Sequence, residues 1–171
     1  MRDEYSCQLR AMGVDDLDAV LAVQAACYPP SMQEAAAVVL ARLAAASGSC
    51  LVAVDAAGVC AYLFAYPSML GVVTPLGAAF DPAPAPDTLY LHDLAVAPRA
   101  HGHGLARRLV AHSLAQAREQ GVAASSLVSV QDTAGFWASL GYRPADVASP
   151  HASAALATYP GAARYMTRKL D

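Results

Sequence analysis

Residues 89–106 read LYLHDLAVAPRAHGHGLA, and their pattern decides the fold. Leu89 to Val96 is a mostly apolar run that is too short for a buried helix and suits a buried strand, which Pro98 ends. After the glycines, apolar residues recur at helical spacing from Ala106 to Ala117. The stretch therefore predicts a strand, a glycine loop and a helix in succession.

The loop at Gly102 and Gly104 predicts an anion site. The first N–H groups of a helix have no partner within it, and the helix dipole adds partial positive charge, so phosphate is stabilised there. Glycine also lets the N–H groups converge on one phosphate or pyrophosphate. A P-loop is excluded because Leu105 and Ala106 stand where Lys and Ser or Thr are required. A dinucleotide fold is disfavoured because Arg107 replaces the third glycine.

The same residues resemble the signature of the GNAT superfamily of acyl-CoA-dependent N-acyltransferases. Arg99, Gly102 and Gly104 fill its pattern of Arg or Gln, two residues, Gly, one residue and then Gly or Ala. The preceding LAVAP, residues 94–98, matches the usual strand ending of that family. Residues 136–142 resemble its Phe-Tyr, three residues, Gly-Phe block, and the two blocks occur in the expected order.

The resemblance covers about residues 51–142 and implies an α/β fold. We expect a mixed, mostly antiparallel sheet of six to seven strands, with helices on both faces and a splayed central pair of strands. The splay would lie between the strand ending at Val96 and its neighbour at 125–130. The chain of 171 residues is expected to form a single acetyltransferase domain, residues 1–171.

Periodicity and turn residues predict the other elements. Ser31 is expected to cap a helix, with Glu34 at the capping-box position. Residues 67–87 and 150–161 are expected to be irregular, the former either a lid or a plain connection. Strands are expected at 5–10, 51–54, 59–66, 89–96, 125–130, from 142 onward and at 164–170, and helices at 15–26, 31–46, 104–120 and 133–140.

The composition narrows the class of partner. Charged residues make up 15% of the chain and apolar residues 56%, which is far from a disordered composition. The net charge of −3 argues against a nucleic-acid-binding surface. No long apolar run predicts a membrane span, and the polar start predicts a cytoplasmic protein. The four cysteines are scattered without a Cys-x-x-Cys pair, so no metal site is expected.

The chemistry that the resemblance implies is acyl transfer from a thioester to an amine. An amine is protonated near pH 7 and must lose a proton before it attacks, so a base is needed. His92 is the expected base, because histidine ordinarily has a pKa near ~6.5; the alternative is a hydrogen-bonded core histidine. Strand alternation places Tyr90 on the face of His92 and puts Leu91 and Asp93 on the other face. Asp93 is expected mainly to support the fold.

Trp137 stands where the family usually has the tyrosine that protonates the departing thiolate. An indole N–H can donate a hydrogen bond but is no acid at neutral pH. Water, Tyr90 or Ser129 would then have to serve, or the thiolate leaves unassisted. The Asn that commonly begins this block is matched by Gln131 only after a deletion.

The resemblance also implies contacts with the two substrates, acetyl-CoA and an amine. Tyr28 and Glu34 would lie near the acceptor amine, although Glu34 could equally be only a cap. His92 and Tyr90 are the expected catalytic residues. The residues expected to contact acetyl-CoA are Leu94, Ala95, Val96, Arg99, Ala100, His101, Gly102, His103, Gly104, Leu105, Ala106, Gln131 and Trp137.

Two functions remain open at this point. The first is an acetyl-CoA-dependent N-acetyltransferase of a small molecule, an amino acid or a protein or peptide. The second is an acyl-CoA-binding sensor or interaction protein with weak or no activity, for which Trp137 is the main argument. A monomer or a homodimer would be compatible with either, and the sequence leaves the acceptor open.

Overall fold

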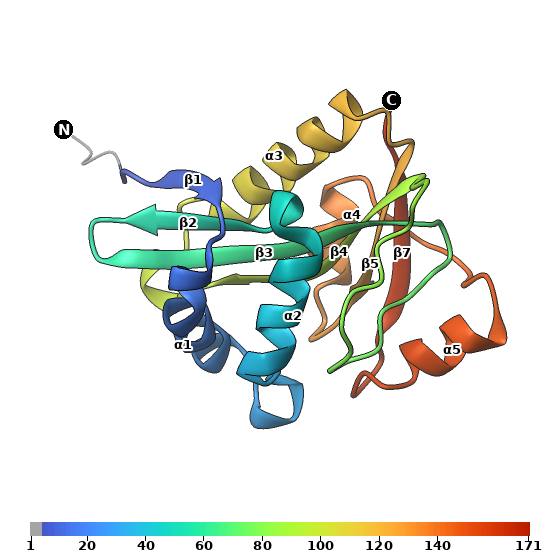
Figure 1. The fold of residues 1–171 in the computed structure, drawn as a ribbon, viewed down its shortest axis with the longest axis horizontal. Helices are drawn as coiled ribbons and strands as arrows, with labels where there is room; N and C mark the ends of the chain where they lie inside the picture. Colours follow the sequence, from blue (N-terminus) through green and yellow to red (C-terminus); the bar gives the residue numbers. More distant parts are fainter. Residues whose placement is uncertain (1–4) are drawn as a thin grey trace.

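The computed structural model describes residues 5–171, in which seven strands form one sheet in the order β1-β2-β3-β4-β5-β7-β6 (Figure 1). Neighbouring strands are antiparallel except β4 and β5, which are parallel. This confirms the mixed, mostly antiparallel α/β sheet. The strands are β1 Gln8–Ala11, β2 Leu51–Asp55, β3 Gly58–Ser68, β4 Thr88–Val96, β5 Ala124–Ser129, β6 Arg143–Pro144 and β7 Arg164–Lys169.

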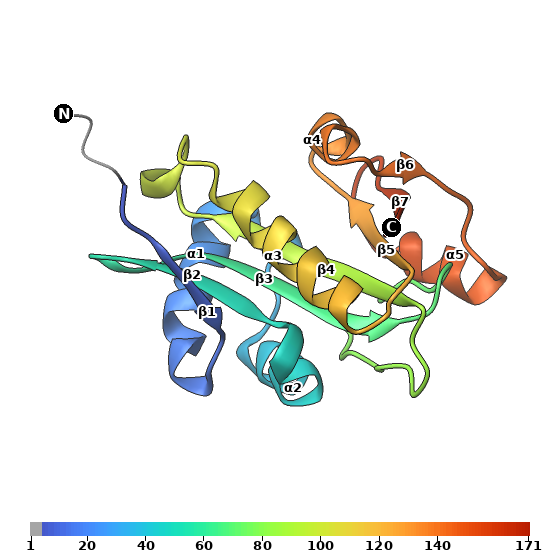
Figure 2. The ribbon, with the colours of Figure 1, turned by 90° about the horizontal axis from the view of Figure 1, so that it is seen from above.

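Helices cover both faces of this sheet (Figure 2). α1 (Leu17–Cys27) and α2 (Ala36–Ala46) lie on one face, whereas α3 (Leu105–Glu119) lies on the other with α4 (Ala134–Ser139). A separate apolar core fills the space on each side, one including Tyr62 and Phe64, the other Leu63 and Leu109. Because side chains alternate along β3, this strand contributes residues to both cores, which fixes its central place in the sheet.

The second helix begins later than the sequence predicted. Residues Pro30–Met32 form a single 3₁₀ turn, and α2 starts only at Ala36, so neither Ser31 nor Glu34 caps it. The physical reason is Gln24, whose side-chain amide bonds both the backbone carbonyl and the backbone N–H of Glu34, at 3.0 and 3.1 Å. These bonds hold an extended backbone at Glu34 and turn its carboxylate into the interior.

Residues 150–161 were expected to be irregular, and that expectation is wrong for their first half. α5 spans Pro150–Leu156 and is capped by the Ser149 hydroxyl, which accepts from the Ala152 N–H at 3.1 Å. A serine cap followed by proline at the first helical position was the signal for it. The irregular segment predicted at 67–87 begins two residues later, because β3 continues through Pro67 and Ser68; residues 69–87 contain no helix or strand.

β4 leaves β5 halfway along its length. Its pairing with β5 runs only from Thr88 to Leu91, whereas its pairing with β3 continues to Val96. The central strand pair is therefore splayed, as the family resemblance implied. The gap opens between the second half of β4 and the end of β5.

A β-bulge marks the point where the strands part. On β3, Phe64 lies opposite Asp93 and Ala65 opposite Leu91, so His92 is the extra residue. The bulge reverses the side-chain alternation beyond it. Asp93 consequently accepts a hydrogen bond from Tyr62 in the core beneath α1 and α2, and the prediction that Asp93 faces away from His92 is wrong.

Candidate active site in the splay of the sheet

The backbone of β4 offers free hydrogen-bond donors in the splay. The Ala97 N–H bonds the Cys60 carbonyl of β3 at 2.8 Å, so the antiparallel pattern turns the N–H groups of Leu94 and Val96 toward the β5 side. β5 no longer pairs there. Side chains bond the outward carbonyls instead. His101 Nε2 donates to the Val96 carbonyl at 2.8 Å, and Tyr28 shares its single proton between Asp93 at 2.7 Å and the Leu94 carbonyl at 3.1 Å. The two N–H groups remain in position to meet a ligand.

A cavity of about 460 Å³ occupies this splay and is called the acyl cavity below. Tyr28 and His92 form one end of it, and β4 and β5 provide its long walls. Most of its lining is apolar, which suits a narrow organic chain. Seven of the residues expected to contact acetyl-CoA line it, namely Leu94, Ala95, Val96, His101, Ala106, Gln131 and Trp137.

A second cavity, of about 310 Å³, lies against the glycine loop and is called the loop pocket. It shares the wall residues Val96, His101, Ala106 and Phe136 with the acyl cavity, so the two cavities adjoin each other. Gly102 and Gly104 have φ values of 84° and 71°, a left-handed conformation that glycine adopts without strain. The remaining expected residues that line the loop pocket are Ala100, Gly102, Gly104 and Leu105.

Two expected contact residues turn their side chains away from both cavities. Arg99 forms an ion pair with Asp55 and donates to the Val59 carbonyl at 3.2 Å. His103 stacks on Tyr5 with ring centroids 3.9 Å apart. The structure therefore brings the loop backbone, but not these two side chains, to the loop pocket.

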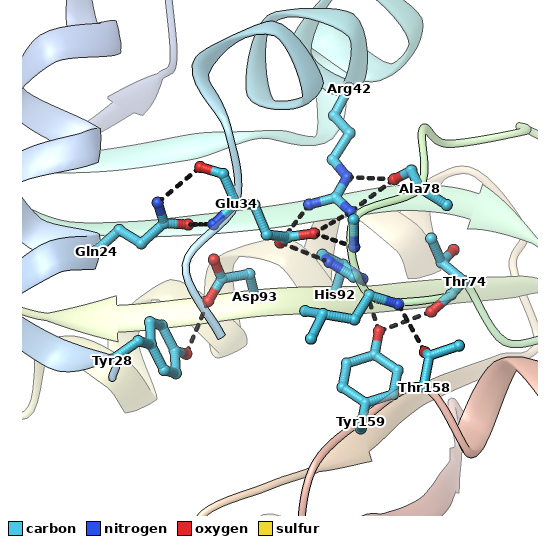
Figure 3. A network of polar contacts seen from close by, with 12 residues as sticks. Gln24, Tyr28, Glu34, Arg42, Thr74, Ala78, His92, Asp93, Thr158 and Tyr159 are labelled. Carbon is cyan, nitrogen blue, oxygen red and sulfur yellow. Dashed lines mark hydrogen bonds and ion pairs between the residues drawn. The ribbon is translucent and has the colours of Figure 1, made fainter. Parts of the chain in front are cut away.

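At the other end of the acyl cavity lies a buried charged network (Figure 3). Arg42 from α2 donates hydrogen bonds to both carboxylate oxygens of Glu34, and His92 Nε2 lies 3.2 Å from Glu34 Oε1. The side chains of Arg42, Glu34 and His92 are only 2%, 4% and 1% exposed. Burial alone raises the pKa of Glu34, but the hydrogen bonds from His92 and Arg42 outweigh it and hold this pKa at about 2.

Tyr159 closes the network on the far side of His92. Its hydroxyl donates to the Thr74 carbonyl at 2.7 Å and lies 3.5 Å from His92 Nδ1. A small pocket of about 30 Å³, here called the acceptor pocket, lies among Tyr159, His92, Tyr28 and their neighbours. The acceptor pocket shares Tyr28, His92 and Asp93 with the acyl cavity. His92 thus lies where the two meet.

Asp93 anchors the entrance to this region. It accepts hydrogen bonds from Tyr28 at 2.7 Å and from Tyr62 at 2.8 Å. Burial raises its pKa, and the nearby His92 and the two hydroxyls oppose that rise. The paired tyrosines fix the carboxyl group in place, which fits the supporting role expected of Asp93.

The residues considered as the proton source for the thiolate are not equally well placed. Tyr90 is fully buried behind His92, lines none of the three cavities, and its hydroxyl has no hydrogen-bond partner among the described residues. Ser129 is engaged with Thr133 at 3.1 Å. Trp137 lines the acyl cavity and packs edge-to-face against Tyr142. Trp137 therefore stands, in place of a tyrosine, at the position where the family usually has its acid.

Sequence reasoning missed Arg42 and Tyr159. Arg42 is the only charged residue of α2, AAVVLARLAAA, and a lone arginine among apolar residues was a signal for a buried pair. Tyr159 lies beyond α5 and is 67 positions from His92. No local pattern could have linked that pair.

Neither a metal centre nor a membrane span is found in residues 5–171. No group of three or more His, Cys, Asp or Glu side chains in this part gathers as metal ligands. None of its helices is both long and apolar enough to cross a bilayer.

The chain matches the acetyltransferase (GNAT) family over residues 17–142 and belongs to that family. Its fold is similar to that of the GphF GNAT-like decarboxylase in complex with isobutyryl-CoA, with a TM-score of 0.81, 21% identity, and coverage of 96% of this chain and 100% of that one. The ribosomal-protein-S18-alanine N-acetyltransferase from Escherichia coli gives a TM-score of 0.68 and 15% identity over 97% and 95% of the two chains.

The PaiA N-acetyltransferase from Thermoplasma acidophilum, solved in complex with coenzyme A, gives a TM-score of 0.68 and 11% identity over 96% and 99% of the two chains. At these identities the likeness concerns the fold. No curated protein sequence matches the chain.

Proposed function

We propose that the protein transfers an acetyl group from acetyl-CoA to a primary amine of a small molecule, an amino acid or a protein or peptide. One observation carries the proposal. His92, hydrogen-bonded to Glu34, forms the wall of the acyl cavity at the point where the free N–H groups of β4 begin. A base and oxyanion donors therefore meet at one place, as acyl transfer requires.

Acetyl-CoA would lie along the adjoining acyl cavity and loop pocket. The N–H groups around Gly102 and Gly104 at the start of α3 would hold the pyrophosphate. The pantetheine would follow β4, with the thioester carbonyl facing the N–H of Leu94 or Val96. A donor aimed at the developing oxyanion lowers the activation barrier by about 3 kcal/mol.

The acceptor nitrogen must lose two protons in this reaction, one before it attacks and one after. His92 takes the proton from the ammonium group, and the free amine attacks the thioester carbon. A C–N bond forms, the nitrogen of the adduct releases its second proton to water, and the C–S bond breaks with its electron pair leaving on the CoA sulfur. Since Trp137 cannot act as an acid, the thiolate would receive its proton from water.

The charges near His92 favour a cationic acceptor. Glu34 and Asp93 both approach the acceptor pocket. Arg42 is fully engaged with Glu34 and with the Ala78 carbonyl, and no lysine or arginine lines the acyl cavity or the acceptor pocket among the described residues. An ammonium group would therefore be attracted, whereas a carboxylate would have no cation to bind.

A second candidate function is acyl-CoA binding without transfer. It is favoured by the small acceptor pocket, of about 30 Å³, and by Trp137 in the place of the usual acid. An acceptor larger than a few atoms requires the covering segments around Leu76 and Tyr159 to move apart. A binding protein would have no such need.

Turnover of acetyl-CoA, detected as free thiol, tests the proposal across a panel of amines, amino acids and peptides. Calorimetry of acetyl-CoA binding runs beside it, and so does a His92→Ala variant. We expect turnover with one class of amine, about 10²-fold to 10⁴-fold slower in the variant, while binding persists. A carboxyacyl-CoA is also tested without amine, because the fold is similar to that of a GNAT-like decarboxylase. Tight binding with no turnover in any arm would support the second candidate instead.

A further inference from the structure

We propose that Glu34 is a positioning residue that fixes His92 with its proton on Nε2, so that Nδ1 is the nitrogen that takes the proton of the acceptor amine. This inference rests on the proposed function, which supplies the reaction. It assigns Glu34 to the orientation of the base, in place of the direct contact with the acceptor that the sequence suggested.

The contacts of Glu34 leave it no capacity for a substrate amine. Its two carboxylate oxygens accept from both terminal nitrogens of Arg42, from the Gly77 N–H at 2.8 Å, and from His92. A carboxylate offers about four lone-pair sites, so these four donors occupy them. Glu34 is held ionised inside the protein and points its charge at His92.

The same contacts decide which nitrogen of His92 carries the proton. An ionised carboxylate can only accept, so the 3.2 Å contact requires a hydrogen on Nε2. On the opposite side, Tyr159 gives its proton to the Thr74 carbonyl and does not donate to Nδ1. Nδ1 therefore receives no hydrogen bond from the described residues, and His92 lines the acceptor pocket.

Several other charged or titratable groups surround His92. The effect of Glu34 on the pH dependence of the reaction must be distinguished from the effects of these groups. Burial raises the pKa values of the surrounding tyrosines, which stay neutral throughout the working range. Asp93 is the only other carboxylate close to His92 among the described residues. The groups are Glu34 and Arg42 on the α2 side, Asp93 and Tyr90 on β4, Tyr28 after α1, Tyr66 on β3 and Tyr159 after α5.

The test combines the tautomer of His92, read by ¹⁵N NMR without substrate, with the pH dependence of kcat/KM. In the native protein we expect the proton on Nε2. In Glu34→Gln we expect it to shift toward Nδ1, kcat to fall roughly 10-fold to 100-fold, and the acid limb of the profile to move to lower pH. Affinity for acetyl-CoA should stay within about twofold, because the loop pocket is untouched.

Two further variants keep the test decisive. If Glu34→Gln does not fold because Arg42 is left unpaired, the double change Glu34→Gln/Arg42→Gln removes both charges and is measured in its place. Tyr159→Phe is the matched control, because it removes the hydroxyl group beside Nδ1. The proton of His92 should stay on Nε2 in this variant. Asp93→Asn reports the contribution of the second carboxylate to the pH profile.

The outcomes separate the inference from the proposed function. A native His92 that carries its proton on Nδ1 overturns the positioning role, whether or not the protein turns over. A folded Glu34 variant with native tautomer and native pH profile overturns it as well. Absence of turnover by the native protein contradicts the proposed function alone, since the NMR measurement needs no reaction.

Discussion

The glycine loop after β4 and the charged network around His92 lie at the two ends of a pair of adjoining cavities, and they present different parts of the chain to a ligand. At the loop, backbone N–H groups face the cavity while Arg99 and His103 turn outward. Around His92, buried side chains from three distant segments form the site. The first kind of site depends on local conformation, and the second on the whole fold.

The two arginine–carboxylate pairs make the same contrast in energetic terms. The side chain of Arg99, paired with Asp55, is 42% exposed, whereas that of Arg42, paired with Glu34, is 2% exposed. An exposed pair is screened by water and contributes little to stability. A buried pair becomes costly when one partner is removed, because the other charge is left without compensation.

The largest expected effect is therefore on stability at Arg42. Arg42→Met should destabilise the protein by about 3–5 kcal/mol, since Glu34 would remain buried without its main partner. Urea unfolding followed by circular dichroism measures the change. Adding Glu34→Gln should recover part of the loss, and Arg99→Ala should cost far less. Equal losses at Arg42 and Arg99 would remove the distinction between the two pairs.

The second prediction concerns acid. The pKa of Glu34 is lowered to about 2 from its ordinary 4.5, so its contribution to stability is complete above about pH 4.5 and is lost as the pH falls toward 2. The loss is on the order of 3 kcal/mol. Unfolding free energies measured across this range should fall less steeply in Glu34→Gln than in the native protein. Parallel curves would show that Glu34 is not held ionised by the network.

A smaller effect is expected at the glycine loop, and it concerns affinity. Gly104→Val forces a β-branched residue into a left-handed conformation, so affinity for CoA should fall about tenfold or more. Calorimetry should find Arg99→Ala within about twofold of the native affinity, because its side chain lies outside the pocket. Gly48→Ala, where a Cβ meets nothing within 4 Å, is the glycine control. A strong effect of Arg99→Ala alone would mean that side chains, not backbone, hold the anion.

The smallest effect is expected at Trp137. Because an indole gives no proton at neutral pH, Trp137→Phe should leave kcat within about threefold of the native value. Steady-state turnover of acetyl-CoA measures it, with melting temperature as the check on packing against Tyr142. A hundredfold loss would show that Trp137 contributes to the chemical step.

The loop end was predictable from the sequence because its determinants are local. Pro98, Gly102 and Gly104 impose the turn, and the apolar spacing of α3 follows directly. The mixed sheet and its splayed central pair of strands followed from family resemblance rather than from any residue pattern. The start of α2 was mispredicted because Gln24, ten positions away, overrides the helical preference of Ser31 to Ala35.

The other end could be predicted only in part. His92 was predicted as the base because a histidine interrupts an apolar strand, but its partners lie 58 and 67 positions away in the sequence. The side of the sheet to which Asp93 points was mispredicted. A bulge shifts the alternation of side chains by one residue and leaves no clear trace in the amino-acid sequence. Tertiary contacts decide such a site, and a single sequence does not record them.

The measurement that tests the account most directly is a titration of the ¹⁵N-labelled protein with acetyl-CoA, followed through backbone amide shifts. The account predicts the largest shifts at the amides of Leu94 and Val96 in the splay and at Gly102 to Leu105 in the loop. Saturating shifts that spare these amides and gather elsewhere, for example beside the separate cavity at Asp81 and His151, would contradict it.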